Sequence, residues 1–92
     1  MAGMGDERLT FRYLNKQGVE SNTGFVVHIT DRFALEYRRG SFRMGCGTEG
    51  GPDMDVYVPR LPFGNLTPGR RAEIITEIGA ALDLMGIPHD IK

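Results

Sequence analysis

The sequence predicts an α+β fold: an antiparallel sheet of about four to six strands with one C-terminal helix packed on one face. Two observations lead to this. Apolar and polar residues alternate in several short segments of the first 60 residues, and the only long helical pattern follows them, between residues 67 and 86. We expect residues 1–8 to be a flexible N-terminus and residues 9–92 to form a single domain, because 92 residues suffice for one small core.

Residues 33–46, FALEYRRGSFRMGC, predict a β-hairpin, because a two-residue turn at Arg39-Gly40 brings apolar residues together on one face. Gly40 supplies the positive φ that such a turn needs. The expected pairs on the apolar face are Tyr37 with Phe42, Leu35 with Met44 and Phe33 with Cys46. On the other face, Glu36 lies opposite Arg43 as a cross-strand charge pair.

Three other segments have strand patterns. Residues 9–14 and 54–58 alternate, and residues 25–30 are apolar and β-branched, as in a strand buried on both faces. Residues 15–24, 45–53 and 60–66 are rich in glycine, asparagine, proline or acids and are interpreted as loops, with a turn at Asp31-Arg32. Residues 87–92 are short and partly apolar, compatible with a closing edge strand.

The helix has signals at both ends. Thr67 is a good N-cap and Pro68 fits the first helical position, while Gly86 suits the left-handed residue after the last turn. Apolar residues recur at helical spacing: Ile74, Ile75, Ile78, Ala81, Leu82 and Met85. Gly79 costs about 1 kcal/mol relative to alanine within a helix, so we interpret it as a point of close approach to the sheet.

Composition argues against several classes of function. The formal net charge of -1 is not that of a general nucleic-acid or membrane-surface binder. The sequence has no run of about 18 apolar residues, the length needed to span a membrane. Its N-terminus lacks the pattern of a secretory signal. A single cysteine needs no oxidising compartment, so a cytoplasmic location is expected.

No catalytic, cofactor or metal site is apparent in the sequence. His28 and His89 lie far apart, and Cys46 falls on the apolar face of the hairpin. Glycines 45, 47, 50 and 51 are not followed by the Gly-Lys-Ser/Thr and helix of a phosphate-binding loop. The arginines of the hairpin region, Arg32, Arg38, Arg39 and Arg43, are interpreted as a solvated face. A non-enzymatic protein is therefore expected.

Two sets of charged residues are candidates for binding a partner protein. The helix carries Arg70 in its first turn, where it opposes the helix dipole, and Glu73 and Glu77 repel each other at i, i+4. Stability alone would not favour this pattern. The second set, Glu49, Asp53 and Asp55, lies in and after the glycine-rich segment and would suit a basic partner surface.

The segments HITDRFALEYRRG, VYVPRL and LTPGRRAEIITEIGAALDLMGI together resemble a group of small bacterial immunity proteins of polymorphic-toxin and contact-dependent growth-inhibition systems. The resemblance covers about residues 27–91 and includes no catalytic signature. Phe63 lies where such sequences have a tryptophan, between the late strand and the helix. The resemblance implies a non-enzymatic cytoplasmic protein that binds and neutralises one cognate bacterial toxin domain, often a nuclease. It carries over no contact residue.

The alternative is a small structural or regulatory subunit that oligomerises, for instance as a homodimer, through an exposed edge of its sheet. An enzyme is a third and weaker interpretation, because the residues provide no catalytic constellation.

Overall fold

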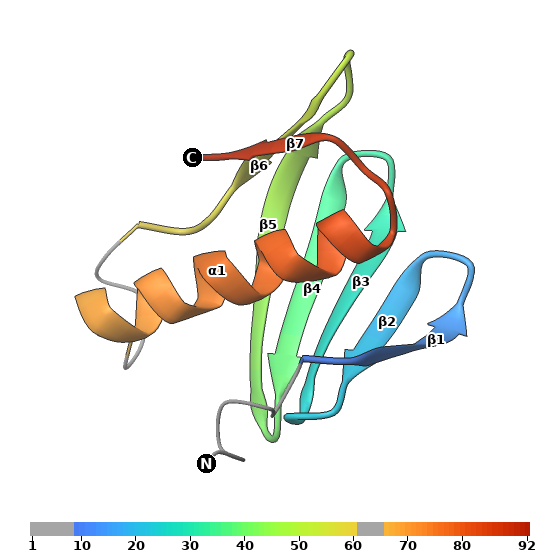
Figure 1. Cartoon of the computed structure of the whole chain (residues 1–92). Coiled ribbons are helices and arrows are strands. Elements are labelled where there is room, and N and C mark those ends of the chain that lie inside the picture. The colour runs from blue at the N-terminus through green and yellow to red at the C-terminus, as the bar shows by residue number, and fades with distance from the viewer. Residues whose placement is uncertain (1–8, 61–65) are drawn as a thin grey trace, which may run out of the picture.

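The computed structural model describes residues 9–60 and 66–92, which form a curled seven-stranded sheet with one helix across its concave face (Figure 1). The strands lie in the sheet in their chain order. Their bounds are β1 Phe11–Asn15, β2 Gly18–Ser21, β3 Phe25–Asp31, β4 Ala34–Arg39, β5 Phe42–Glu49, β6 Met54–Tyr57 and β7 His89–Ile91, with helix α1 Pro68–Leu84 between β6 and β7. The predicted α+β class and the position of the helix are confirmed.

The number and direction of the strands differ from the prediction of four to six antiparallel strands. There are seven, and β7 pairs with β6 in parallel. The helix explains the direction, because a chain that crosses a sheet face through a helix returns parallel to the strand it left. Residues 87–92 therefore do supply a closing strand.

One of the additional strands is β2, in the segment 15–24 that the sequence predicts to be a loop. Val19 is fully buried and lies opposite Tyr13 on one side and Val27 on the other. Ser21 is also buried, and its hydroxyl accepts hydrogen bonds from the backbone N–H groups of the next turn. Because Val19 is the only large apolar residue of β2, the strand has no visible alternation.

The central hairpin forms, but its turn lies one residue later than predicted, at residues 40–41. Gly40 has the expected positive φ of 59°. Tyr37 pairs with Met44 and Leu35 with Cys46, so the predicted pairs and the Glu36–Arg43 charge pair are wrong. Arg43 instead lies opposite Arg38.

This register moves each pair by two residues, and a shift of two preserves the face of every strand residue. The inward positions of Leu35, Tyr37, Met44 and Cys46 are therefore confirmed by their burial. Phe33 is the exception. The turn before β4 lies at residues 32–33 rather than 31–32, and Phe33 is 63% exposed.

Two further boundaries are corrected. β5 runs to Glu49, so most of the predicted loop 45–53 is strand: buried Cys46 and Thr48 alternate with exposed Gly45 and Gly47. The first strand covers residues 11–15 rather than 9–14, and Leu9 and Tyr13 are exposed. The strands predicted at 25–30 and 54–58 are confirmed as β3 and β6. Of the predicted loop 60–66, residues 61–65 lie outside the described part of the chain, as does the predicted flexible segment 1–8.

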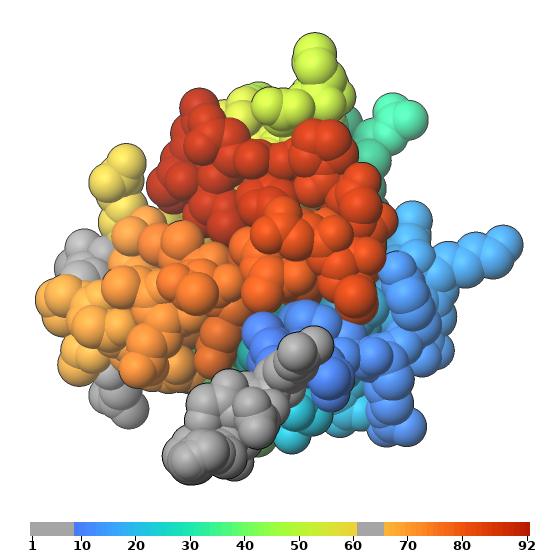
Figure 2. Space-filling view, viewed as in Figure 1, coloured from blue at the N-terminus to red at the C-terminus, as the bar shows by residue number. Residues whose placement is uncertain are grey.

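The helix begins and ends as predicted. The Thr67 side chain accepts a hydrogen bond from the backbone N–H of Arg70, Pro68 is the first helical residue, and Gly86 has φ 73°. Ile74, Ile78, Ala81 and Leu82 are fully buried against the sheet. Figure 2 shows that α1 and β7 cover much of the concave face. No helix in the described ranges is long and apolar enough to cross a membrane.

Gly79 lies close to β7, but not so close that a side chain is excluded. A Cβ there would stand 3.5 Å from His89 Nε2 and 3.7 Å from Ile91 Cδ1, which are ordinary contacts. Gly79→Ala should therefore stabilise the protein by about 0.5–1 kcal/mol, the helix-propensity difference, in urea denaturation.

Gly18→Ala should have the opposite effect on stability, because a side chain at Gly18 would meet a neighbour too closely. A Cβ at Gly18 would lie only 2.8 Å from His28 Cδ2, so this alanine should lower stability. Destabilisation by Gly79→Ala would show that the helix packs closer to β7 than described.

Candidate protein-binding surface

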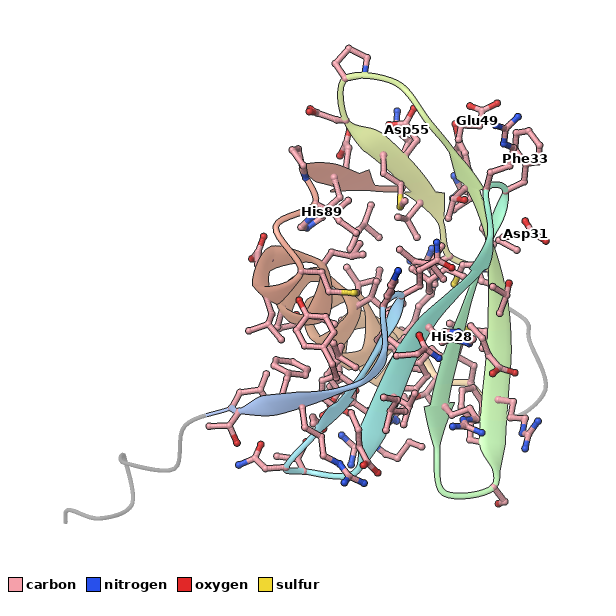
Figure 3. All side chains as sticks on the ribbon, turned by 90° about the vertical axis from the view of Figure 1, so that its right-hand side faces the viewer. His28, Asp31, Phe33, Glu49, Asp55 and His89 are labelled. Atoms are coloured by element: carbon pink, nitrogen blue, oxygen red, sulfur yellow. The ribbon has the colours of Figure 1, made fainter. Side chains whose placement is uncertain are left out.

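Three carboxylates form a row across β5, β6 and β7. Glu49 pairs with Asp55, and Asp55 pairs with Asp90. Their neighbours Thr48 and Val56 point into the core, so the row lies on the opposite, outer face of the sheet. Figure 3 shows Glu49 and Asp55 at one end of the molecule. Like charges on directly opposed residues destabilise a sheet, so folding stability does not account for this row.

The charges around the row compensate it only in part. Lys92 Nζ lies 3.9 Å from Asp55 Oδ1 and 3.8 Å from Asp90 Oδ2, at the outer limit of an ion pair. The Tyr57 hydroxyl donates a 2.8 Å hydrogen bond to Glu49 Oε1. This bond raises the pKa of Tyr57, and the charges of Glu49, Asp55 and Asp90 act in the same direction. Asp53 is exposed in the preceding loop. We call Glu49, Asp53, Asp55 and Asp90 the acidic end.

Two exposed aromatic side chains lie beside the acidic end. Tyr57 is 41% exposed and lies opposite Gly47 of β5. On its other side, Gly47 pairs with Ala34 of β4, the residue that follows the second aromatic, Phe33. Nothing lies within 4 Å of where a Cβ would stand on Gly47, so the backbone between the aromatics is open. Figure 3 shows Phe33 close to Glu49. Exposed aromatics with a charged rim are a common composition for a protein-binding surface.

The turn that presents Phe33 is held by hydrogen bonds. Asp31 Oδ1 accepts a 2.7 Å bond from the Phe33 N–H, and the Phe33 carbonyl accepts a 2.9 Å bond from the Thr48 N–H. The Arg32 guanidinium lies over the Phe33 ring at 5.8 Å. An anchored turn presents its side chain at a low entropic cost to binding.

The helix residues Arg70, Glu73 and Glu77 come together elsewhere, near the 40–41 end of the hairpin, with Tyr37 and Arg39. Glu77 accepts a 2.5 Å hydrogen bond from the Tyr37 hydroxyl and a 2.7 Å bond from Arg39 Nη2. Arg70 donates to the Tyr37 hydroxyl at 2.9 Å and to Glu73 at 2.8 Å. We call these five residues the Tyr37 cluster. Most of them line an open pocket of about 530 Å³ with Thr76.

The Tyr37 cluster explains the charge pattern of the helix. Arg70 at the helix start is compensated by Glu73 and by Glu77, 3.9 Å away, and the repulsion between the two glutamates is relieved by Arg39 and Arg70. Burial and the hydrogen bond to Glu77 raise the pKa of Tyr37, so its hydroxyl stays protonated as a donor. The charged side chains of this cluster have partners within the chain, and its hydrogen bonds link α1 to β4.

The remaining polar candidates are separated. His28 is half-buried on the outer face opposite Gly18 and Glu36, and His89 Nδ1 lies 2.9 Å from the Ile87 carbonyl. Burial raises the pKa of Cys46 to about 11, so it is a thiol in the core. In the part of the chain that the structure describes, no group of three or more His, Cys, Asp or Glu could hold a metal ion.

Of the residues gathered at this end, sequence reasoning proposed Glu49, Asp53 and Asp55 but not Asp90, Phe33 and Tyr57. The outward direction of Tyr57 was visible in the alternation of residues 54–58, whereas the position of Asp90 depends on a pairing with no local signal. Comparison of the chain with protein-family models, with curated proteins and with solved structures gave no match.

Proposed function

We propose that this chain is a non-enzymatic immunity protein that binds and neutralises a cognate bacterial toxin domain in the cytoplasm, and that the toxin is a nuclease. The proposal depends mainly on the row of Glu49, Asp55 and Asp90 beside the exposed Phe33 and Tyr57. The choice of a toxin as the partner rests on the resemblance of residues 27–91 to immunity proteins.

The chemistry of a nuclease fits the acidic end. A site that grips phosphates is lined with lysine and arginine, and a row of carboxylates can occupy it in place of the nucleic acid. Neighbouring strands are about 4.8 Å apart, so the three carboxylates present closely spaced negative charges along one line. Exposed rim charges accelerate association, while the aromatic rings supply apolar contact that slows dissociation.

The same observations favour the acidic end over the Tyr37 cluster as the binding surface. Glu77 and Arg39 are already engaged with each other at 2.7 Å, and a partner would have to break these bonds to use them. Asp53 is exposed, and the Lys92 contacts of Asp55 are long. The carboxylates of the acidic end can therefore meet a basic partner at a smaller desolvation cost.

Affinity capture from the native bacterium, followed by mass spectrometry, tests the proposal. We expect the wild-type protein to retain a toxin domain with a basic active-site cleft, and the variant Glu49→Ser/Asp53→Ser/Asp55→Ser to lose most of it. The control Glu73→Ser/Asp83→Ser removes two exposed carboxylates from the helix and should retain it. Equal capture by the triple variant, or capture only of proteins unrelated to toxins, would contradict the proposal.

A further inference from the structure

β1 is an edge strand of the sheet that the described residues form. It pairs with β2 on one side, and within residues 9–60 and 66–92 no strand lies on its other side (Figure 1). Four of its five residues are exposed. Three of the large hydrophobic side chains that remain exposed lie on this one segment: Leu9 at 40%, Tyr13 at 56% and Leu14 at 44%. An exposed apolar edge strand is a template for pairing with another strand.

The backbone groups of β1 define which residues can pair. The Thr10 carbonyl accepts a 2.8 Å hydrogen bond from the Asn22 N–H, so the main-chain groups of Thr10 point toward β2. These groups alternate in direction along an antiparallel strand. Those of Leu9, Phe11 and Tyr13 therefore point away from β2, toward the free edge.

We infer that two copies of this chain pair through β1 in an antiparallel manner, with Phe11 on the two-fold axis. Leu9 of each copy then lies opposite Tyr13 of the other, and Phe11 opposite Phe11. All of these residues have outward-pointing main-chain groups, so the arrangement forms three hydrogen-bonded residue pairs and one continuous sheet. This inference does not rest on the proposed function.

The side chains also favour a second copy as the occupant of the edge. Because side chains alternate along a strand, Leu9, Phe11 and Tyr13 lie on one face. There Phe11 packs edge-on against Phe25, with the two ring centroids 5.7 Å apart. In the dimer, the exposed Tyr13 ring covers the exposed Leu9 of the other copy, and such aromatic–aliphatic cross-strand pairs are favourable. The edge is thus complementary to itself.

Arg12 selects the register. A shift to put the two-fold axis at Arg12 would keep the hydrogen-bond phase but place Arg12 directly opposite Arg12 of the second copy, which is repulsive. With the axis at Phe11, Arg12 instead lies opposite Thr10 and keeps its hydrogen bond of 2.8 Å to Glu20. The opposite edge, β7, has only three residues, with exposed Asp90 and Lys92 close by. Short, charged edges disfavour pairing, so β1 is the edge to pair.

Sedimentation equilibrium of the full chain over a range of concentrations tests the dimer. We expect the wild type to dimerise, and Tyr13→Lys to weaken dimerisation by at least about tenfold, because each dimer then carries two lysines in the new pairing. Phe33→Lys is the matched control, since Phe33 is 63% exposed in the turn before β4, at the far end of the molecule from β1 (Figure 3); it should dimerise like the wild type. A wild type that is monomeric at every concentration, or a Tyr13→Lys variant that dimerises normally, would overturn the inference.

Disulfide cross-linking tests the register. Thr10 and Arg12 form opposed pairs in the proposed dimer, so the double variant Thr10→Cys/Arg12→Cys should cross-link under mild oxidation, and Arg12→Cys alone should not. The native Cys46 is buried and its pKa is about 11, so it does not compete. Efficient cross-linking of Arg12→Cys alone would contradict the Phe11 axis.

Discussion

Leu35→Ala should lower the free energy of unfolding by about 2–5 kcal/mol, the usual cost of truncating a buried leucine. Leu35 is 1% exposed and lies opposite Cys46 and Ile29 in the centre of the sheet, so its removal leaves a cavity that these strands cannot close. Urea denaturation, with the midpoint and slope compared to those of the wild type, measures the change.

Arg38→Ala is the control on the same strand. Arg38 points to the outer face, where it lies opposite Arg43, so the substitution relieves a like-charge pair and leaves the inner face of β4 unchanged. Its effect should stay below about 0.5 kcal/mol. Should Arg38→Ala prove the more damaging of the two, the faces of β4 would be exchanged.

The second large effect is expected for Glu77→Ala, which should cost about 2–3 kcal/mol. Glu77 is the shared acceptor of the partly buried Tyr37 hydroxyl and of Arg39, and its removal leaves both donors without their charged partner. Hydrogen bonds to a charged group are the stronger class, and a partly buried donor left unsatisfied adds to the loss.

Glu73→Ala is the control that separates the loss of the Glu77 hydrogen bonds from the loss of one negative charge on the helix. Glu73 lies one turn earlier on the same helix, but its side chain is 66% exposed and its ion pair is with Arg70 alone. An exposed pair of this kind contributes at most about 1 kcal/mol. Similar losses in the two variants would mean that the Tyr37 cluster does not join the helix to the sheet.

The elements that could be predicted from the sequence are those with local signals. The capping residues Thr67 and Gly86 and the apolar stripe of α1 act within one segment, as do the β-branched residues of β3. The faces of the central hairpin were also predicted correctly despite the wrong pairs, because a register error of two residues does not change the side to which Leu35 or Met44 points.

The missed elements depend on partners distant in sequence. β2 contains glycine, glutamate and serine and becomes a strand because Val19 fills the core between β1 and β3. The glycines of β5 suggested a loop, yet they alternate with Cys46 and Thr48, which are buried. β7 is placed by its parallel pairing with β6. Tertiary packing decides such segments, whatever their composition.

The residues of the candidate surface also divide into those with a local sequence signal and those placed by contacts distant in sequence. Glu49, Asp53 and Asp55 could be proposed together because they lie within one short segment of the sequence. The carboxylate of Asp90 and the exposed ring of Phe33 join them only through the pairing of β6 with β7 and through the position of the turn before β4. For Arg70 and Glu77, the sequence does not reveal their contacts with Tyr37 and Arg39, which lie more than 30 residues away in the chain.

Association kinetics of the acidic-end variant test the central claim most directly. The measurement uses the captured toxin domain with wild-type protein and with Glu49→Ser/Asp53→Ser/Asp55→Ser, at a series of salt concentrations. Glu49 and Asp53 are exposed and Asp55 is half-buried, so none of the three substitutions alters the core. The variant should therefore fold normally, which circular dichroism can check. Rim charges act mainly on the association rate and are screened by salt. We predict slower association of the variant at low salt and a flatter dependence on ionic strength, whereas unchanged kinetics would contradict binding through the acidic end.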